Sequence, residues 1–384
     1  MTDETTYRLR LPGPTAVPEA VRQAIARPAL SHRGREFTAI LRRVEELIQP
    51  VLGTRQPVLF FASSGTGMME AALVNILAPG ERVLVAVNGQ FGERFAAIAQ
   101  ALGAQVDALE IQWGRAVAAG EVERRIDAAE YRGVVIVHNE SSTGVVSDLA
   151  AIGAVLRGRP TLLVADSVSG LGGMAMRQDE WGVDVVVSAS QKALMCPPGL
   201  GLVSISEKAW KVAGRADRLP RFYWDFRKAM AAMEKPDQPE TPFTTPVSLV
   251  AGLCEALEMI HREGLPHVLA RHRRLSAALR AGCAALGLRP YGQADALSST
   301  VVALEVPGGL DGGEIVRALY ERHGTVIAGS RNKLAGRVIR IGTMGHVSAG
   351  DILTDLWHLE ATLRELGQTV SAGAGVAAAA AVLQ

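Results

Sequence analysis

The stretch that decides the fold of this 384-residue chain is residues 183–201, VDVVVSASQKALMCPPGLG. Its β-branched beginning is typical of a strand that is covered on both faces, as in a parallel sheet. Two serines and Gln191 then precede Lys192, and the Pro-Pro-Gly sequence that follows prevents a helix and permits a tight turn. We therefore expect Lys192 to leave a buried strand and enter a small polar pocket.

Partial burial would make Lys192 chemically reactive. Burial penalises the protonated amine, so the pKa falls and the amine becomes available to form an imine with an aldehyde or to act as a base. A lysine after a strand is more often a solvated loop residue. The case for a site therefore depends on the rest of the chain.

Short strands alternate with helices over the first half of the sequence, which predicts an α/β protein with a mostly parallel central sheet flanked by helices. Ligand groups gather at the carboxyl ends of such strands. The residues that lie just beyond the ends of predicted strands are Thr66, Phe91, Ser141, Asp166 and Lys192. We expect these five side chains to lie along one edge of one sheet.

The predicted strands of this sheet are residues 58–62, 82–87, 134–137, 161–165, 183–187 and 200–205. The predicted helices begin at Pro18 and cover 37–52, 68–77, a segment ending at Leu102, and 149–156. Residues 214–246 read as an irregular, aromatic-rich connection. Helices 247–262, 271–286, 313–323 and 349–366 and strands 301–306 and 338–341 predict a smaller C-terminal α/β domain.

These elements divide the chain into four parts. Residues 1–14 form an N-terminal arm, 15–255 a large domain, 256–368 a small C-terminal domain, and 369–384 a tail rich in alanine and glycine. We expect the tail to be mobile or a frayed helix.

A glycine-rich turn, Ser63-Ser64-Gly65-Thr66-Gly67, joins a predicted strand to a predicted helix. This arrangement presents backbone N–H groups and a positive helix end to an anion such as phosphate. Similar turns also occur for steric reasons alone, and an aromatic such as Phe91 often serves only in packing. The combination is more specific than any of its parts.

A lysine, an aspartate 26 residues before it (192 − 166), an anion cup and an aromatic are the parts that pyridoxal 5'-phosphate requires. The lysine holds the aldehyde as an imine, and the carboxylate keeps the pyridine nitrogen protonated. Asp166 ends an apolar strand, LLVAD, where an unpaired charge would be costly, so a cationic partner such as a pyridinium is expected.

With these motifs the sequence resembles the class V aminotransferases of the fold type I pyridoxal phosphate enzymes, most closely the alanine-glyoxylate and serine-glyoxylate (serine-pyruvate) aminotransferases. The resemblance covers residues 11–366. The matching segments begin at Gly13 (GPTAVPEAV), Ser63 (SSGTGMMEAALVN), Asn88 (NGQFGER), His138 (HNESSTGV), Ala165 (ADSVSGLGG), Ser188 (SASQKALMCPPGLG), Thr244 (TTPVSL) and Val338 (VIRIGTMG).

The resemblance implies a role for each matching residue. Lys192 and Asp166 are the catalytic pair, and Arg340 is the arginine that binds the substrate carboxylate. The cofactor-binding residues implied are Gly65, Thr66, Gly67, Phe91, Ser141, Asp166, Val168, Gln191, Lys192 and Thr244. Thr244 would reach the phosphate across a dimer interface. Some relatives place a tyrosine three residues earlier, where this chain has Thr241, so the contact is expected at Thr244.

Composition favours work on small molecules. The formal net charge is +1 and no stretch approaches 18 uninterrupted apolar residues, so neither nucleic acid nor a membrane is an expected partner. Cys196, Cys254 and Cys283 form no regular framework, which fits reduced thiols in a cytoplasmic compartment and no metal site. Cys196 is expected to be inert, and His138 to be packed rather than catalytic.

The predicted function is transamination from a small L-amino acid, alanine or serine, to glyoxylate or pyruvate by a cytoplasmic homodimer whose active site is shared between subunits. Ureidoglycine and aspartate remain open as donors. The alternatives in other classes are a lyase of the cysteine desulfurase type and a non-catalytic subunit.

Overall fold

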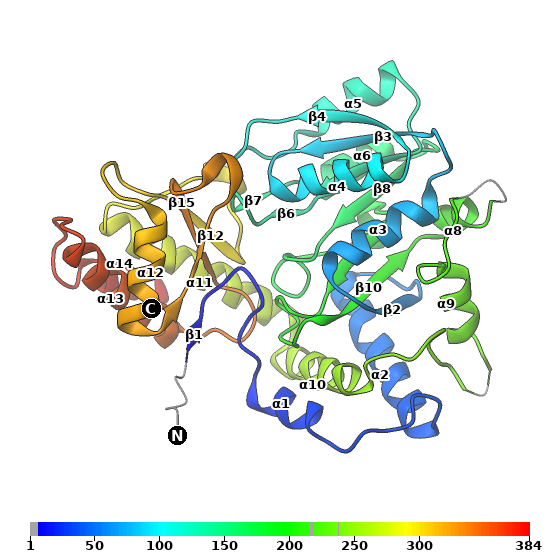
Figure 1. Cartoon of the computed structure of the whole chain (residues 1–384), viewed down its shortest axis with the longest axis horizontal. Coiled ribbons are helices and arrows are strands. Elements are labelled where there is room, and N and C mark those ends of the chain that lie inside the picture. The colour runs from blue at the N-terminus through cyan, green and yellow to red at the C-terminus, as the bar shows by residue number, and fades with distance from the viewer. Residues whose placement is uncertain (1–6, 216–218, 237) are drawn as a thin grey trace.

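The computed structural model describes residues 7–215, 219–236 and 238–384, and builds them around two sheets (Figure 1). The larger sheet has seven strands in the order β2-β10-β9-β8-β5-β3-β4. Its strands are β2 (Val58–Ser63), β3 (Arg82–Val87), β4 (Gln105–Glu110), β5 (Gly133–Val137), β8 (Leu162–Asp166), β9 (Val185–Ala189) and β10 (Gly199–Ile205). Only β10 is antiparallel to its neighbours. The expected mostly parallel sheet is confirmed.

Helices cover both faces of this sheet, as the buried strands require. One face packs against α2 (Arg35–Leu52), α5 (Ala119–Ala128), α6 (Leu149–Leu156) and α10 (Val247–Glu263), and the other against α3 (Gly65–Ile76), α4 (Gln90–Ala101), α8 (Glu207–Ala213) and α9 (Phe226–Met233). Two shorter helices, α1 (Glu19–Ile25) and α7 (Gln178–Trp181), and the small strands β6 (Asn139–Glu140) and β7 (Val145–Val146) complete this part of the chain.

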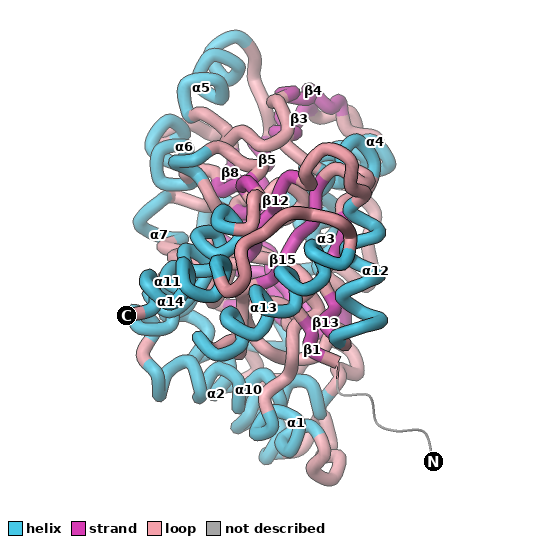
Figure 2. The backbone as a smooth tube through the Cα atoms, turned by 90° about the vertical axis from the view of Figure 1, so that its left-hand side faces the viewer, coloured by secondary structure: helices cyan, strands magenta, loops and turns pink. Residues whose placement is uncertain are grey.

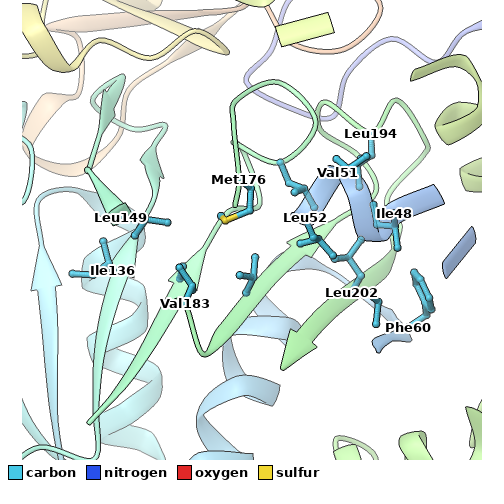
Figure 3. Close-up of a cluster of buried hydrophobic side chains, with 14 of the residues drawn as sticks. Ile48, Val51, Leu52, Phe60, Ile136, Leu149, Met176, Val183, Leu194 and Leu202 are labelled. Carbon is cyan, nitrogen blue, oxygen red and sulfur yellow. The ribbon is translucent and has the colours of Figure 1, made fainter. Parts of the chain in front are cut away.

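The period of two in each strand decides which residue faces which helix layer. In β8, for example, Leu163 and Ala165 belong to the core on the side of α6, while Leu162 and Val164 belong to the core on the opposite face of the sheet. Figure 3 shows the first of these cores, where Ile48 and Leu52 of α2 lie over the sheet near Leu202. Each fully buried side chain of this size contributes about 1.5–3 kcal/mol to the stability of the fold.

The second, smaller sheet is antiparallel, in the order β11-β12-β15-β14. Its strands are β11 (Arg289–Pro290), β12 (Val301–Glu305), β14 (Ala328–Gly329) and β15 (Val338–Gly342), and its helices are α11 (Leu265–Ala285), α12 (Gly312–His323), α13 (Ala349–Glu365) and α14 (Ala374–Leu383). Figure 2 shows α11, α13 and α14 together in front of β12 and β15. Short 3-10 turns cover Ala294–Ala296 and Asn332–Leu334.

The described part of the N-terminal arm, residues 7–14, runs from the side of the small sheet to Lys192. Its strand β1 (Arg8–Leu9) pairs with β13 (Thr325–Val326), and Arg10 forms a buried ion pair with Asp355 of α13 at 2.7 Å. The Gly342 N–H donates to the Arg10 carbonyl at 2.7 Å. The arm therefore leaves the small domain beside the end of β15 and runs toward Lys192.

Two predictions of secondary structure are wrong. The segment 214–246 is not wholly irregular, because α9 packs Phe226 and Ala229 into the core. The tail is not a mobile or frayed end, because α14 buries Ala379 and lies so close to α11 that Gly375 O would stand 2.7 Å from a Cβ at Gly282. A run of small residues permits this close approach of two helices.

Two further elements differ from expectation. Helix α3 begins at Gly65 rather than at residue 68, so the glycine-rich turn is itself the first turn of the helix. Strand β4 and helix α5 were not predicted. As an edge strand, β4 is largely half-buried or exposed, and this weakens the hydrophobic pattern from which a strand is predicted.

Candidate active site

Lys192 lies three residues beyond β9, in the turn that leads back into β10. Its Nζ donates a hydrogen bond to the carbonyl of Pro12 in the N-terminal arm. Burial lowers the pKa of the Lys192 amine to about 8, a shift that the Asp166 carboxylate opposes and that Arg340 and Arg94 reinforce. The expectation of a partly desolvated lysine with a lowered pKa fits this geometry.

Asp166 is the last residue of β8, the strand next to β9, and is 4% exposed. Burial raises the pKa of its carboxyl to about 6, while the Val168 N–H and the positive charges of Lys192 and Arg94 oppose the shift. The Val168 N–H donates to Oδ1 at 2.8 Å. Because burial penalises the ionised carboxylate, a cationic ligand placed against Asp166 would stabilise it and be bound strongly.

The glycine-rich turn presents the start of α3 to the same sheet edge. The Ser64 side chain caps the helix by accepting from the Gly67 N–H at 3.3 Å. A Cβ at Gly65 would stand 2.9 Å from the Val168 side chain, and one at Gly67 would stand 2.3 Å from Ser63 Oγ. The absence of side chains at both positions permits this close packing, and the helix dipole at this end favours an anion.

Phe91 lies in the first turn of α4, which a buried carboxylate caps from below. Glu140 Oε2 accepts from the backbone N–H groups of Phe91 at 3.0 Å and Gly92 at 3.2 Å, and Oε1 accepts from the Ser142 hydroxyl at 2.5 Å. A Cβ at Gly89 would stand 2.3 Å from Glu140 Cγ. Glu140 thus fixes the position from which the Phe91 ring projects.

Arg340 reaches this region from β15 of the small sheet. Its Nη1 donates to the carbonyl of Ser141 at 3.1 Å and its Nη2 to the carbonyl of Gly329 at 2.7 Å. Burial lowers the pKa of the guanidinium, and the charge of Glu140 opposes this shift. Since both of its contacts are neutral carbonyls, a carboxylate would be a stronger partner for this cation.

Two residues of the arm, Pro12 and Gly13, cover the Lys192 side chain and form a roof over it. Gly13 has φ +107°, and a Cβ there would stand 2.4 Å from Lys192 Cδ and 2.6 Å from Nζ. Thr15 fastens the next turn, because its N–H donates to the Gln191 carbonyl at 3.1 Å and its hydroxyl to the Lys192 carbonyl at 2.9 Å. The arm, which also pairs with β13 and α13, thereby contacts Lys192.

The structure brings most of the predicted residues together but leaves Thr244 apart. Ser141 is buried, and the side-chain carbonyl of Gln191 is buried without a hydrogen-bond partner. Thr244 is exposed and lines a small surface hollow with Tyr223 and Phe243. Thr241 is buried, and its hydroxyl donates to the Phe243 carbonyl at 2.8 Å.

His138 and Cys196, which lie near the site residues in the sequence, are buried, as expected of packed residues. His138 is buried with Nδ1 3.0 Å from Ser167 Oγ, and burial lowers its pKa to about 4. Cys196 is buried, and burial raises the pKa of its thiol to about 12. A thiol of that pKa is protonated at neutral pH and is a poor nucleophile.

A separate cavity of about 860 Å³ lies between loop 110–119, Trp181 and loop 293–299. His138 and Arg273 also line it, but Lys192, Asp166 and Arg340 do not. Among the described residues no group of three or more His, Cys, Asp or Glu is placed to hold a metal ion. Within the same residues no helix is long and apolar enough to cross a membrane.

Three parts of this arrangement were missed from the sequence: Glu140 beneath α4, Arg94 on α4, and the roof made by Pro12 and Gly13. Each lies in or next to a segment that carries the family resemblance, HNESSTGV, NGQFGER and GPTAVPEAV. The segments were visible, but which of their side chains face the site depends on the fold.

The mixed seven-stranded sheet, with a lysine and a carboxyl beyond the ends of neighbouring strands and a smaller second sheet, is the fold of the fold type I aminotransferases. The family model described as "Aminotransferase class-V" matches residues 15–350. The chain belongs to this family, whose members are pyridoxal phosphate-dependent aminotransferases.

Individual relatives are similar over nearly the whole chain. A protein named soluble hydrogenase 42 kDa subunit, from Anabaena cylindrica, is 39% identical over 97% of this chain and 98% of its own. A serine–glyoxylate aminotransferase from Methylorubrum extorquens is 36% identical over 98% and 96%. The crystal structure of ureidoglycine-glyoxylate aminotransferase from Bacillus subtilis superposes with a TM-score of 0.93, at 30% identity over 98% of both chains.

Proposed function

We propose that this protein transfers the amino group of a small L-amino acid, alanine or serine, to glyoxylate or pyruvate, with glyoxylate as the preferred acceptor. The observation that carries the proposal is the meeting of three groups: the Lys192 amine and the Asp166 carboxyl, whose pKa values burial brings to about 8 and about 6, and Arg340 from the other sheet. An amine, an acid and a carboxylate-binding cation are the set that transamination needs.

The residues present fit pyridoxal 5'-phosphate. Asp166 is a buried acid without a cation at hydrogen-bonding distance among the described residues, and the Gln191 side-chain oxygen is buried without a partner. Lys192 would hold the cofactor aldehyde and Asp166 its ring nitrogen. The remaining proposed contacts are Gly65, Thr66, Gly67 and Gln191 with the phosphate, Phe91 and Val168 with the two ring faces, and Ser141 with the ring's phenolic oxygen. When bound, the cofactor supplies an electron sink for the substrate α-carbon.

Lys192 would move the proton at the substrate α-carbon. Its lowered pKa means that a substantial fraction of the amine is neutral near pH 8, so it takes up and releases a proton readily there. Asp166, with a pKa of about 6, is mostly ionised at the same pH and so favours a positive charge facing it.

Arg340 would orient the substrate. A carboxylate that binds the guanidinium with two parallel hydrogen bonds would replace the Ser141 and Gly329 carbonyls as its partners. Because Arg340 reaches the site from the small sheet while Lys192 lies on the large one, the carboxylate would be bound from one side and the α-hydrogen would point toward the other.

The roof over Lys192 favours a small donor. Gly13 lies so close to the Lys192 side chain that there is no room even for a methyl group on the Gly13 Cα. Alanine and serine extend little beyond the α-carbon, so they fit beneath the arm with the least displacement. Ureidoglycine and aspartate are longer, and the donor series in the experiment below ranks all four.

Glyoxylate is favoured as acceptor because two relatives with different donors share it by name, the serine–glyoxylate and the ureidoglycine-glyoxylate aminotransferases. A cysteine desulfurase-like lyase is disfavoured by the buried thiol of Cys196. A non-catalytic subunit would have no use for a buried amine and a buried carboxyl, Lys192 and Asp166, whose pKa values are both shifted toward neutral pH.

We further propose a homodimer in which Thr244 completes the phosphate site of the partner. Phe222 is 68% exposed and stacks on Phe243, which also stacks on Tyr223 at 5.1 Å. Trp224, in the same aromatic cluster, lies beside Gly67 of the anion cup. An exposed aromatic surface next to the cup is suited to bind a second copy that places its Thr244 there.

The testing experiment is half-reaction spectroscopy. Cofactor-loaded protein is mixed with alanine, serine, aspartate or ureidoglycine, and loss of the visible cofactor band is followed, then its return on addition of glyoxylate or pyruvate. Loss with alanine or serine and recovery with glyoxylate is the expected result. No loss with any donor, loss that no oxo acid reverses, or a cofactor band that persists through dialysis after Lys192→Ala would refute the proposal.

A further inference from the structure

Arg94 is a cation at the anion cup to which the family resemblance assigned no role. It lies on α4, one turn after Phe91, and is partly buried. Its Nη1 donates to the hydroxyl of Thr66 at 2.9 Å. Thr66 lies between the two glycines of the glycine-rich turn, so the guanidinium stands at the start of α3 although it comes from a different helix.

The guanidinium also lies over the ring of Phe91, with 4.8 Å from its central carbon to the ring centroid. This contact holds a cation above an aromatic face. Together, the Phe91 ring and the Thr66 hydroxyl fix the position and the orientation of the Arg94 guanidinium. None of the ion pairs found among the described residues gives Arg94 a carboxylate partner.

The charge of Arg94 affects two buried residues of the site. It lowers the pKa of Asp166 and also that of Lys192. Arg94 is therefore close enough to act on both residues that would hold the ends of the cofactor ring.

We propose that Arg94 binds the phosphate group of pyridoxal 5'-phosphate, as the cationic member of a cup that is otherwise built from neutral donors. The inference rests on the proposed function, because it concerns the same cofactor site. The Gly65–Thr66–Gly67 turn offers backbone N–H groups, a hydroxyl and a helix dipole, while the phosphate carries nearly two negative charges. An arginine satisfies this charge and can bind two phosphate oxygens at once.

Lys192 does not meet the same need, because its amine is directed to the Pro12 carbonyl in the arm and would be used by the cofactor aldehyde. Arg340 is engaged at Ser141 and Gly329. Arg94 therefore has its own place in the site, at the phosphate end.

The experiment compares the affinities of two probes, pyridoxal 5'-phosphate and pyridoxal, which lacks the phosphate. Arg94→Gln is expected to weaken the binding of pyridoxal 5'-phosphate by about ten- to a hundredfold, the loss of one charge-assisted contact, and to change the affinity for pyridoxal much less, through the small effect on Lys192 and Asp166 alone. Inorganic phosphate should compete with the cofactor on wild-type protein and less on Arg94→Gln. The affinity of the wild-type protein for pyridoxal 5'-phosphate should also fall more steeply with rising salt than that of Arg94→Gln. Binding is read from cofactor absorbance, without any turnover.

Two variants complete the design. Arg94→Lys keeps the charge and should retain part of the affinity. Arg124→Gln, on the exposed side of α5, is the matched control and should behave as wild type. Circular dichroism and the unfolding midpoint identify any variant that fails to fold, and Arg94→Lys then carries the comparison with pyridoxal.

Each remaining outcome overturns the inference. Equal weakening of both probes by Arg94→Gln would mean that Arg94 acts on the ring or on the fold. Unchanged affinity for pyridoxal 5'-phosphate with a raised KM for the donor would place Arg94 at the substrate instead. Wild-type protein that binds no pyridoxal 5'-phosphate would refute the proposed function together with this inference, whereas binding that Arg94→Gln does not alter refutes the inference alone.

Discussion

Replacing Gly13 by alanine tests the roof over Lys192 with a single methyl group. The new Cβ would stand 2.4 Å from Lys192 Cδ and 2.6 Å from Nζ, whereas carbon atoms pack at about 3.5–4.0 Å. The arm or the lysine must therefore move by about 1 Å. The φ of +107° adds strain, because L side chains rarely adopt it.

Two consequences of different size follow. Stability should fall by about 1–2 kcal/mol from the backbone strain and by about 1–3 kcal/mol more from the forced contact. The half-reaction with alanine or serine should slow by about a hundredfold, since a misplacement of about 1 Å at a reacting group has that effect. The assay is single-turnover loss of the cofactor band, with urea unfolding in parallel.

Gly158 supplies the matched control. It has φ +77° and no neighbouring atom within 4 Å of a built Cβ, so Gly158→Ala introduces the backbone strain without a contact. If Gly13→Ala loses no more stability than Gly158→Ala and reacts within about threefold of wild type, the arm does not control the lysine and the reasoning is wrong.

Three further predictions concern pH, the substrate carboxylate and the tail. Burial lowers the pKa of Lys192 from 10.5 to about 8, so cofactor uptake by cofactor-free protein should rise with pH, with a midpoint near pH 8. The Asp166 charge raises this pKa, so Asp166→Asn should move the midpoint to lower pH. A wild-type midpoint near pH 10 would contradict the burial argument. Arg340→Lys should lower kcat/KM for the donor by about ten- to a hundredfold, by loss of bidentate binding, with cofactor affinity unchanged in a titration; an equal loss of cofactor affinity would argue against a substrate role. Deletion of residues 369–384 should lower the free energy of unfolding by about 2 kcal/mol or more, because it uncovers Leu286, which lies against Gly375 of α14; an unchanged free energy of unfolding in urea would mean that the tail is not part of the packed fold.

The domain boundary near residue 255 remains a proposal. Helices α10 and α11 meet at Gly264, which adopts φ +85°, so the chain turns between them there. Val268 of α11 still packs with the large core, whereas Leu275 and the residues after it pack with the small one. The two cores therefore share α11, and a boundary within its first turns fits the packing at least as well as one at 255.

The sequence by itself determined that the sheet is mostly parallel, where most of its strands and helices lie along the chain, and the family of the chain. β-branched runs and short turns are local signals, so β8 and β9 with Asp166 and Lys192 at their ends could be predicted from the residues alone. Edge strand β4 and helix α14 could not, because half-exposed strands and alanine-rich helices carry weak patterns and are stabilised by what they pack against.

Only the tertiary structure decided how the site is assembled. The contact of Lys192 with Pro12 joins residues 180 positions apart, and that of Arg340 with Ser141 joins residues 199 apart. Glu140 and Arg94 acquire their places because α4 starts at the edge where β6 and α3 also begin. Such contacts depend on side-chain directions across separate elements, and the pKa values of Lys192 and Asp166 depend on the burial that results, which no local pattern in the sequence specifies.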